Sequence, residues 1–149
     1  MTDDPNDTDL GEYLRECTQI DDLALDGEFI RVPADLAYWS ARYAEAHRAH
    51  LLAKHEVDTT HARLHLSIKA EADLNKTKMT VADLDAAVKS HPDYLAAVLD
   101  VIDADADRLR LRGSLEAVAA KKDMIQSLGA KLRAEMGADP MVRADHSNR

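Results

Sequence analysis

The histidines are the only residues of this chain whose spacing suggests metal or acid–base chemistry. His61 and His65 are one helical turn apart, Asp58 precedes them by about a turn, and His47 and His50 form another such pair. The first three could share a metal ion, but a metal site needs three or four converging ligands, and ligands on one helix lie along a line. We therefore expect histidines of a surface or a helix seam, and no bound metal.

Motifs for catalysis are absent from the sequence. It has no Gly-rich phosphate loop, no cysteine pair and no Gly-x-Ser-x-Gly segment. Asp83 and Asp85 stand near the start of a short helical pattern, where capping and the helix dipole explain them better than acid–base catalysis does. The sequence predicts that this protein is not an enzyme and needs no cofactor.

Basic residues form the more informative set. They bracket the end of one long helical pattern and the connector that follows it: Arg63, Lys69, Lys76 and Lys78, with His61 nearby. Flexible cations at a helix end suit a phosphate backbone, which requires charge and reach but no base-specific geometry. The alternative is that these are ordinary solvated side chains balancing nearby acids. Lys121 and Lys122 add two cations further along the chain.

Two long helical patterns must position these cations. They run from Pro33 to about Leu74 and from Pro92 to about Met136, and each would extend about 60 Å. Between them, Thr80 and Asp83 resemble a capping box at the start of a short helix. The predicted fold is all-α: an elongated hairpin of two long helices with a short connecting helix. An apparent period of two at Arg108–Arg112 is too short to outweigh the surrounding helical pattern.

The first long pattern has a seam that predicts self-association. Its apolar positions alternate in spacings of three and four, as in helices that supercoil with a partner. Small or polar residues in the middle of the seam bury little surface, so one partner helix would leave it weakly stabilised. We expect a homo-oligomer formed through helix packing. The residues assigned to oligomerisation are Leu36, Trp39, Tyr43, Val57 and Leu64.

The charge is unevenly distributed along the chain. The net charge is −9, and residues 1–28 hold ten of the 28 acidic side chains but only one of the 19 bases. Acids and bases balance from residue 29 onward. The sequence predicts an acidic, flexible leader over 1–28, a helical oligomerisation and DNA-binding domain over 29–137, and a disordered tail over 138–149.

Cysteine content and hydropathy predict the compartment. Cys17 is the single cysteine, so no internal disulfide can form and a reducing environment is expected. No apolar run approaches the ~18 residues of a membrane span, and the amino terminus lacks the pattern of a signal peptide. We expect a soluble cytoplasmic protein without a membrane partner.

Short motifs resemble the UvsY family of phage recombination mediators. That family's order is followed by Ile20-Asp21 with Leu23, the aromatic helix around Tyr38, Trp39 and Tyr43, and Ala62-Arg63-Leu64. The segment Lys121-Lys122-Asp-Met-Ile-Gln-Ser-Leu-Gly-Ala130, which comes after a Lys-Thr connector and a His-Pro-Asp-Tyr step, is similar to phage proteins encoded near single-strand annealing and recombinase genes. The similarity covers about residues 20–136. The resemblance implies a ring-like homo-oligomer that binds single-stranded DNA. It also implies two protein partners, a RecA-like recombinase and a single-strand DNA-binding protein.

Two departures from the family concern DNA affinity. Both cations of the family's Lys-Ala-Arg segment contact DNA; here Arg63 matches the second, whereas His61 replaces the first. At pH 7 a neutral histidine contributes less to DNA affinity than a lysine does, and its contribution should grow on acidification. The acidic leader is the second departure.

These observations lead to two hypotheses. The first is a mediator that loads a recombinase onto protein-coated single-stranded DNA in the cytoplasm of a phage-infected bacterium. The second is a structural coiled-coil adaptor or phage assembly protein that does not bind DNA. DNA binding that weakens with salt separates them.

Overall fold

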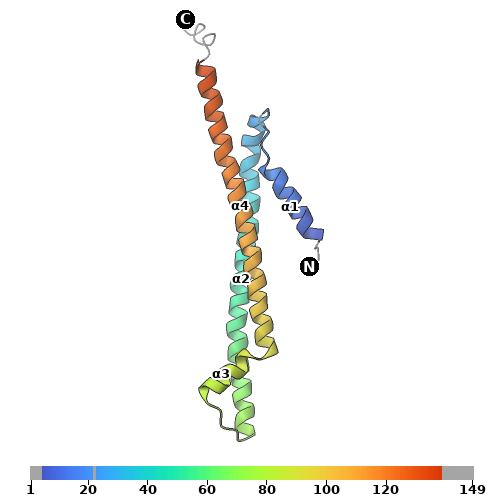
Figure 1. Cartoon of the computed structure of the whole chain (residues 1–149), viewed down its shortest axis with the longest axis vertical. Helices are drawn as coiled ribbons and strands as arrows, with labels where there is room; N and C mark the ends of the chain where they lie inside the picture. The colour runs from blue at the N-terminus through green and yellow to red at the C-terminus, as the bar shows by residue number, and fades with distance from the viewer. Residues whose placement is uncertain (1–4, 22, 139–149) are drawn as a thin grey trace, which may run out of the picture. The chain divides into compact units, whose positions relative to one another are not determined.

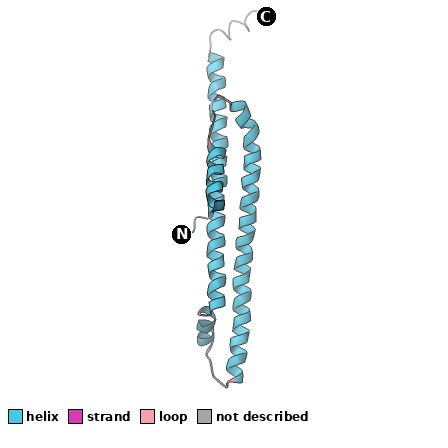
Figure 2. Cartoon of the chain, turned by 90° about the vertical axis from the view of Figure 1, so that its right-hand side faces the viewer, coloured by secondary structure: helices cyan, strands magenta, loops and turns pink. Residues whose placement is uncertain are grey.

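The protein is α-helical throughout the part that the computed structural model describes, residues 5–21 and 23–138 (Figure 1). Four helices follow one another in this range, with no strand among them: α1 (Pro5–Thr18), α2 (Leu25–Leu74), α3 (Val81–Lys89) and α4 (Pro92–Ala138). The two long helices, α2 and α4, pack together, and the short α3 lies in the connection between them (Figure 2). The predicted all-α helical hairpin is thus confirmed. Within these residues no helix is long and apolar enough to cross a membrane.

The helix patterns of the sequence hold in α3 and α4. Thr80 caps α3, because its hydroxyl accepts the Asp83 N–H at 3.2 Å while the Asp83 carboxylate accepts the Thr80 N–H at 3.1 Å. The Thr80 hydroxyl also lies 2.7 Å from the Asp83 carboxylate, and its hydrogen bond, followed by that from the Thr80 N–H, lowers the pKa of the Asp83 carboxyl. Pro92 begins α4, and the Arg108–Arg112 segment is helical. The capping box, the start of α4 at Pro92 and the helical Arg108–Arg112 segment were all predicted.

The start of α2 differs from the prediction. The helix begins at Leu25, so Pro33 lies inside it rather than at its first turn. Ahead of α2, the Asp21 carboxylate accepts the N–H of Leu23 at 2.9 Å and the Asp21 carbonyl accepts that of Ala24 at 3.3 Å. Proline removes one backbone hydrogen bond from a helix. The side chains of Val32 and Asp35, on either side of Pro33, are buried, and this packing keeps α2 helical despite the missing hydrogen bond.

The segment predicted as a leader is helical over most of its length. It contains α1 and the first residues of α2, and both Cys17 and Glu28 within it are buried. The flexibility of the segment stays a prediction. The tail predicted as disordered lies, apart from Ala138, outside the described residues.

The chain forms two compact units, and both long helices contribute to each. Unit 1 comprises residues 1–41 and 113–149, and unit 2 comprises residues 42–112. The core of unit 1 holds Trp39, Val118 and Ile125 together with Cys17 and Val32.

In unit 2 the buried apolar side chains come from α2, α3 and α4. They are Leu64, Leu84, Val88, Ala97 and Leu111. His50 of α2 lies beside Asp105 of α4, and His61 of α2 contacts Tyr94 of α4. Since residue numbers rise along α2 as they fall along α4, the two helices are antiparallel within this unit.

Candidate nucleic-acid interface

The carboxyl end of α2 closes with two backbone hydrogen bonds that turn the chain sharply. The Thr77 N–H donates to the Ala72 carbonyl at 2.9 Å, and the Lys76 N–H donates to the Asp73 carbonyl at 3.2 Å. This is the Schellman arrangement, in which the residue after the cap takes a left-handed conformation and is usually glycine. Here that residue is Lys76, with φ of 54°. A residue with a Cβ pays roughly 1–2 kcal/mol for this conformation.

Three of the predicted DNA-binding lysines gather around this turn. Lys69, Lys76 and Lys78 are exposed, and none of them has a carboxylate partner among the described residues. Lys69 lines a cleft of about 250 Å³ between the end of α2 and the start of α3, and Lys76 and Lys78 line a wider hollow beside it. Asp73 borders both, so the surface is basic but not uniformly so. The last turns of α2 and the connector therefore present three cations that no acidic side chain of the described residues neutralises.

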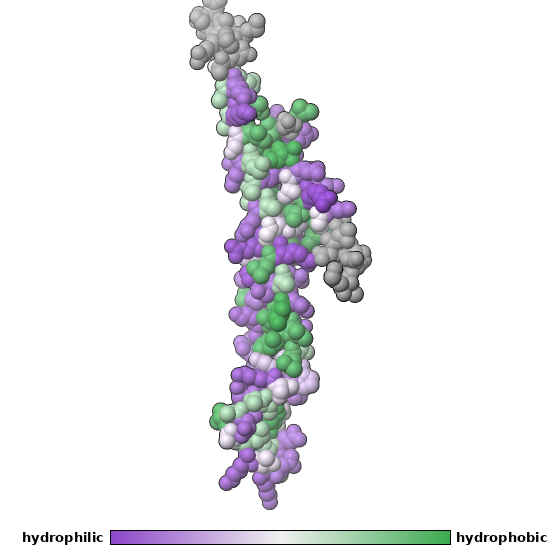
Figure 3. All heavy atoms as spheres, in the orientation of Figure 1, coloured by the Kyte–Doolittle hydropathy of each residue, from purple (hydrophilic) through white to green (hydrophobic). Residues whose placement is uncertain are grey.

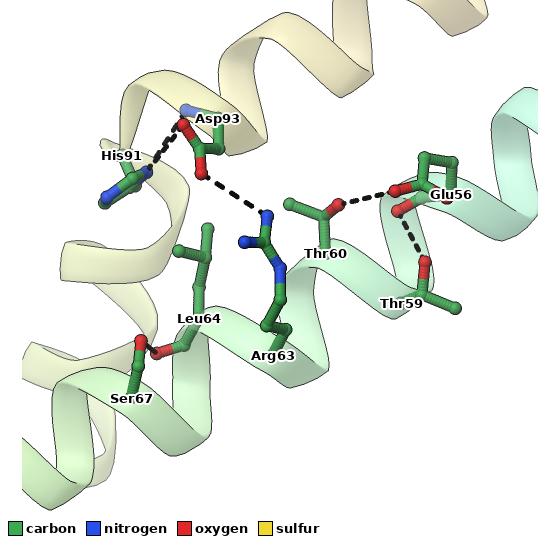
Figure 4. Close-up of polar contacts among 8 residues, drawn as sticks. All are labelled: Glu56, Thr59, Thr60, Arg63, Leu64, Ser67, His91 and Asp93. Carbon is green, nitrogen blue, oxygen red and sulfur yellow. Dashed lines mark hydrogen bonds and ion pairs between the residues drawn. The ribbon is translucent and has the colours of Figure 1, made fainter.

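Arg63 is placed differently. Its guanidinium contacts the Asp93 carboxylate of α4 at 3.3 Å, and the Asp93 N–H donates to Nδ1 of His91 (Figure 4). Six residues of helix turn Arg63 away from Lys69 by about a third of a turn. Arg63 and Lys69 therefore lie on different sides of α2, although the Arg63 side chain is 65% exposed.

His61 also makes contacts within the chain. Its Nε2 lies 3.3 Å from the Asp85 carboxylate of α3, and its ring meets the Tyr94 ring edge-on and stacks on His65. Lys89 contacts the same carboxylate at 2.7 Å, and the pKa of the Asp85 carboxyl is lowered first by Lys89 and then by His61. His61 thus joins α2 to α3 and α4. In the described part of the chain no three potential metal ligands come together.

Lys121 has a structural environment that the sequence reading missed. The side chain is 1% exposed, and its ammonium lies 2.6 Å from the Glu28 carboxylate. The signal was present in the spacing, because position 121 falls three residues after Val118 and four before Ile125, on the inward face of α4. Lys121 is a buried core cation, whereas Lys122 beside it pairs with Asp123 at 3.2 Å.

The residues assigned to oligomerisation face the interior of their own units. Trp39 is fully buried and Leu64 nearly so, while Leu36, Tyr43 and Val57 are half-buried. Each lies on the seam where α2 meets other helices of the same chain. Their role in self-association stays a prediction.

The fold and this connector define an all-α protein with a small basic surface at one helix end. No known protein family, curated protein or solved structure matches the chain.

The Arg63–Asp93 pair allows a direct test of the interface. Replacing Asp93 with asparagine releases the guanidinium, and we expect affinity for a single-stranded oligonucleotide to rise roughly threefold to tenfold at low salt, as one phosphate contact is gained. Fluorescence anisotropy measures this. Asp107→Asn is the matched control, because Asp107 pairs with Arg110 at 2.9 Å within α4 and its loss changes the net charge equally. Equal gains from both variants would mean that Arg63 does not contact DNA.

Proposed function

We propose that this protein binds the backbone of single-stranded DNA at the connector between α2 and α3 and acts as a non-enzymatic recombination mediator. It holds an extended strand while a RecA-like recombinase replaces the single-strand DNA-binding protein that coats it. The observation that carries the proposal is a group of exposed lysines at the end of α2 and in the connector, which have no carboxylate partner in the described part of the chain: Lys69, Lys76 and Lys78.

The conformation of Lys76 supports a functional role for this surface. A lysine occupies the left-handed position where glycine would be less strained. Strained backbone positions occur where a side chain is needed for function. Lys76 is exposed at this sharp turn and lines an open hollow together with Lys78.

Single-strand preference and the mediator role are supported by the resemblance to the UvsY family. Three lysines give weak binding by themselves. Several copies of the chain would present the same cations repeatedly along one strand and raise the affinity through multivalency. The proposed function therefore includes self-association, for which a ring is the form that the resemblance implies.

The structural adaptor is the second candidate, and specific contacts favour it. Arg63, which matches the second cation of the family's DNA-binding segment, and His61, which replaces the first, are engaged with Asp93 and Asp85 inside the chain. Unit 2 also exposes several large apolar side chains that could serve a protein partner. An adaptor predicts no DNA binding even at low salt.

The test removes the connector cations without disturbing the turn. In Lys76→Gly/Lys78→Ala, glycine relieves the left-handed strain, so the fold is retained. We expect the slope of log affinity against log salt concentration to become shallower by about 1.4 for each engaged subunit, at roughly 0.7 per phosphate contact of a single strand. Fluorescence anisotropy with a labelled oligonucleotide at several salt concentrations gives the slope.

The control for this experiment is Lys131→Ala/Arg133→Ala. It removes the same charge from exposed positions of α4 in unit 1. The mediator hypothesis requires that its salt slope match the unaltered protein. An unchanged slope in the connector variant, or no binding by the unaltered protein at low salt, would favour the adaptor.

A further inference from the structure

One face of unit 2 carries a strip of apolar side chains that its own core does not use. The strip runs along α4 at spacings of four, three and seven residues, which place its members on one side of a helix. They are half-exposed or more: Leu95 at 50%, Leu99 at 59%, Ile102 at 56% and Leu109 at 51%. Figure 3 shows apolar side chains gathered over this part of α4. We call these four residues the α4 strip.

Leu51 of α2 extends the strip across the unit. The contact between His50 and Asp105 fixes the level at which the two helices meet, and Leu51 is turned by about 100° from His50. Ile102 precedes Asp105 by three residues, which is equivalent to a turn of about 60° in the forward sense of α4. Because the two helices are antiparallel, turns in the same sense bring Leu51 and Ile102 to the same face of the unit. Leu51 is 52% exposed. The apolar α4 strip is thus joined on α2 by Leu51, which the exposed His47 and Lys54 flank along the helix.

The margins of this surface carry opposite charges. Arg48 precedes Leu51 by three residues on the α2 margin, and Asp103 follows Leu99 by four on the α4 margin. Both are exposed, and neither makes an ion pair with any residue of the described chain. One edge is basic and the other acidic, at levels about 6 Å apart along the helices, which is roughly one helical turn.

A second copy of the chain complements this pattern. When two copies meet through this face about a twofold axis parallel to the helices, α2 of each lies against α4 of the other. Arg48 of each copy then faces Asp103 of the other, so the contact is self-complementary. The reverse arrangement, α4 against α4 about an axis across the helices, brings the two Asp103 carboxylates together and is disfavoured.

We propose that the α4 strip and Leu51 form the interface between two copies of this protein, with α2 of one copy packed against α4 of the other. This proposal rests on the self-association that the proposed function includes. It assigns the contact between copies to the exposed α4 strip, and not to the seam residues Trp39 and Leu64, which are buried within the chain. The test of this interface uses no DNA. The interface can therefore be disproved while DNA binding is retained, and DNA binding can be disproved while the interface is retained.

Sedimentation velocity over a range of protein concentrations tests the interface. We expect the unaltered protein to be at least dimeric at micromolar concentration, and Ile102→Glu to raise the dissociation constant about a hundredfold, as for a central interface residue. Leu66→Glu is the matched control, because Leu66 is 69% exposed and lies outside the strip. Circular dichroism checks that helix content is unchanged. A monomeric unaltered protein, or an equal effect of both variants, overturns the proposal.

Charge exchange tests the arrangement of the two copies. Arg48→Asp and Asp103→Arg should each weaken association about tenfold, since each places like charges together across the interface. The double variant restores the opposite pairing and should recover the original dissociation constant. Additive weakening in the double variant would overturn the packing of α2 against α4.

Discussion

Replacing Lys121 with methionine should lower the free energy of unfolding by about 3–5 kcal/mol, because it leaves the Glu28 carboxylate buried without a cation. The two groups lie 2.6 Å apart, with 1% and 11% of their side chains exposed. The carboxylate also accepts the Asp21 N–H at 3.4 Å, a weaker contact that cannot replace an ammonium. Denaturant unfolding at a fixed protein concentration measures the loss.

Two further variants show whether the buried pair is responsible. Lys131→Met removes a lysine that pairs with Glu135 on the surface, and it should cost less than about 0.5 kcal/mol. Replacing both partners, as in Glu28→Leu/Lys121→Met, should cost less than Lys121→Met alone, since no uncompensated charge remains. A double variant as unstable as the single one would show that packing, and not charge, explains the effect.

The same pair predicts how stability depends on pH. The hydrogen bond from Lys121 lowers the pKa of the Glu28 carboxyl in the folded protein, against the opposing effect of burial. The unfolded state therefore takes up its proton at a higher pH than the folded state does. The stabilisation is complete above the unfolded pKa of roughly 4.3 and is lost as the pH falls through the folded value. In Lys121→Met this loss on acidification should become smaller, because the largest cause of the lowered pKa is removed.

Replacing Trp39 with alanine should destabilise the protein by about 3–5 kcal/mol, the usual cost of deleting a large buried aromatic side chain. Trp39 is fully buried in unit 1. Its ring stacks on Tyr13 of α1 at a centroid distance of 5.9 Å and meets Tyr38 edge-on at 5.4 Å. Trp39 therefore holds α1 against α2, and we expect faster amide hydrogen exchange throughout α1 in the variant.

Trp39→Phe is the matched variant for this prediction. Phenylalanine keeps much of the apolar contact and removes the indole N–H, which is buried and has no hydrogen-bond partner among the residues that the structure describes. The loss of stability should therefore be well below that of Trp39→Ala. Tyr38→Ala should also cost less, because Tyr38 is 42% exposed. Unchanged exchange in α1 of Trp39→Ala would contradict the role assigned to the indole.

The helices and their ends were largely determined by the sequence. Pro92 at the first turn of α4, and Thr80 with Asp83 at the start of α3, act through hydrogen bonds and steric effects within a few residues. Such local effects operate in the same way whatever the rest of the chain does. The beginning of α2 could not be predicted from Pro33, because burial of more distant residues compensates for the hydrogen bond that a proline removes.

The candidate site was predictable only in part. The lysines at the connector lie where a helix end and a turn expose them, and the order of the sequence alone indicates this. The spacing of Lys121 marks it as inward-facing, but the sequence identifies no partner for either Lys121 or Arg63. The tertiary structure places the first beside Glu28 and the second beside Asp93, since the pairing of a charge depends on which distant helix packs against it.

Periodicity also identified the seam of α2 without identifying its partner. The spacing of Trp39 and Leu64 marks them as inward-facing, but burial of apolar surface is favourable against any apolar neighbour. The sequence by itself therefore determined which side of each helix avoids water. Only the tertiary structure decided that these seams close within the chain and that the α4 strip is left exposed, because that depends on which helices meet.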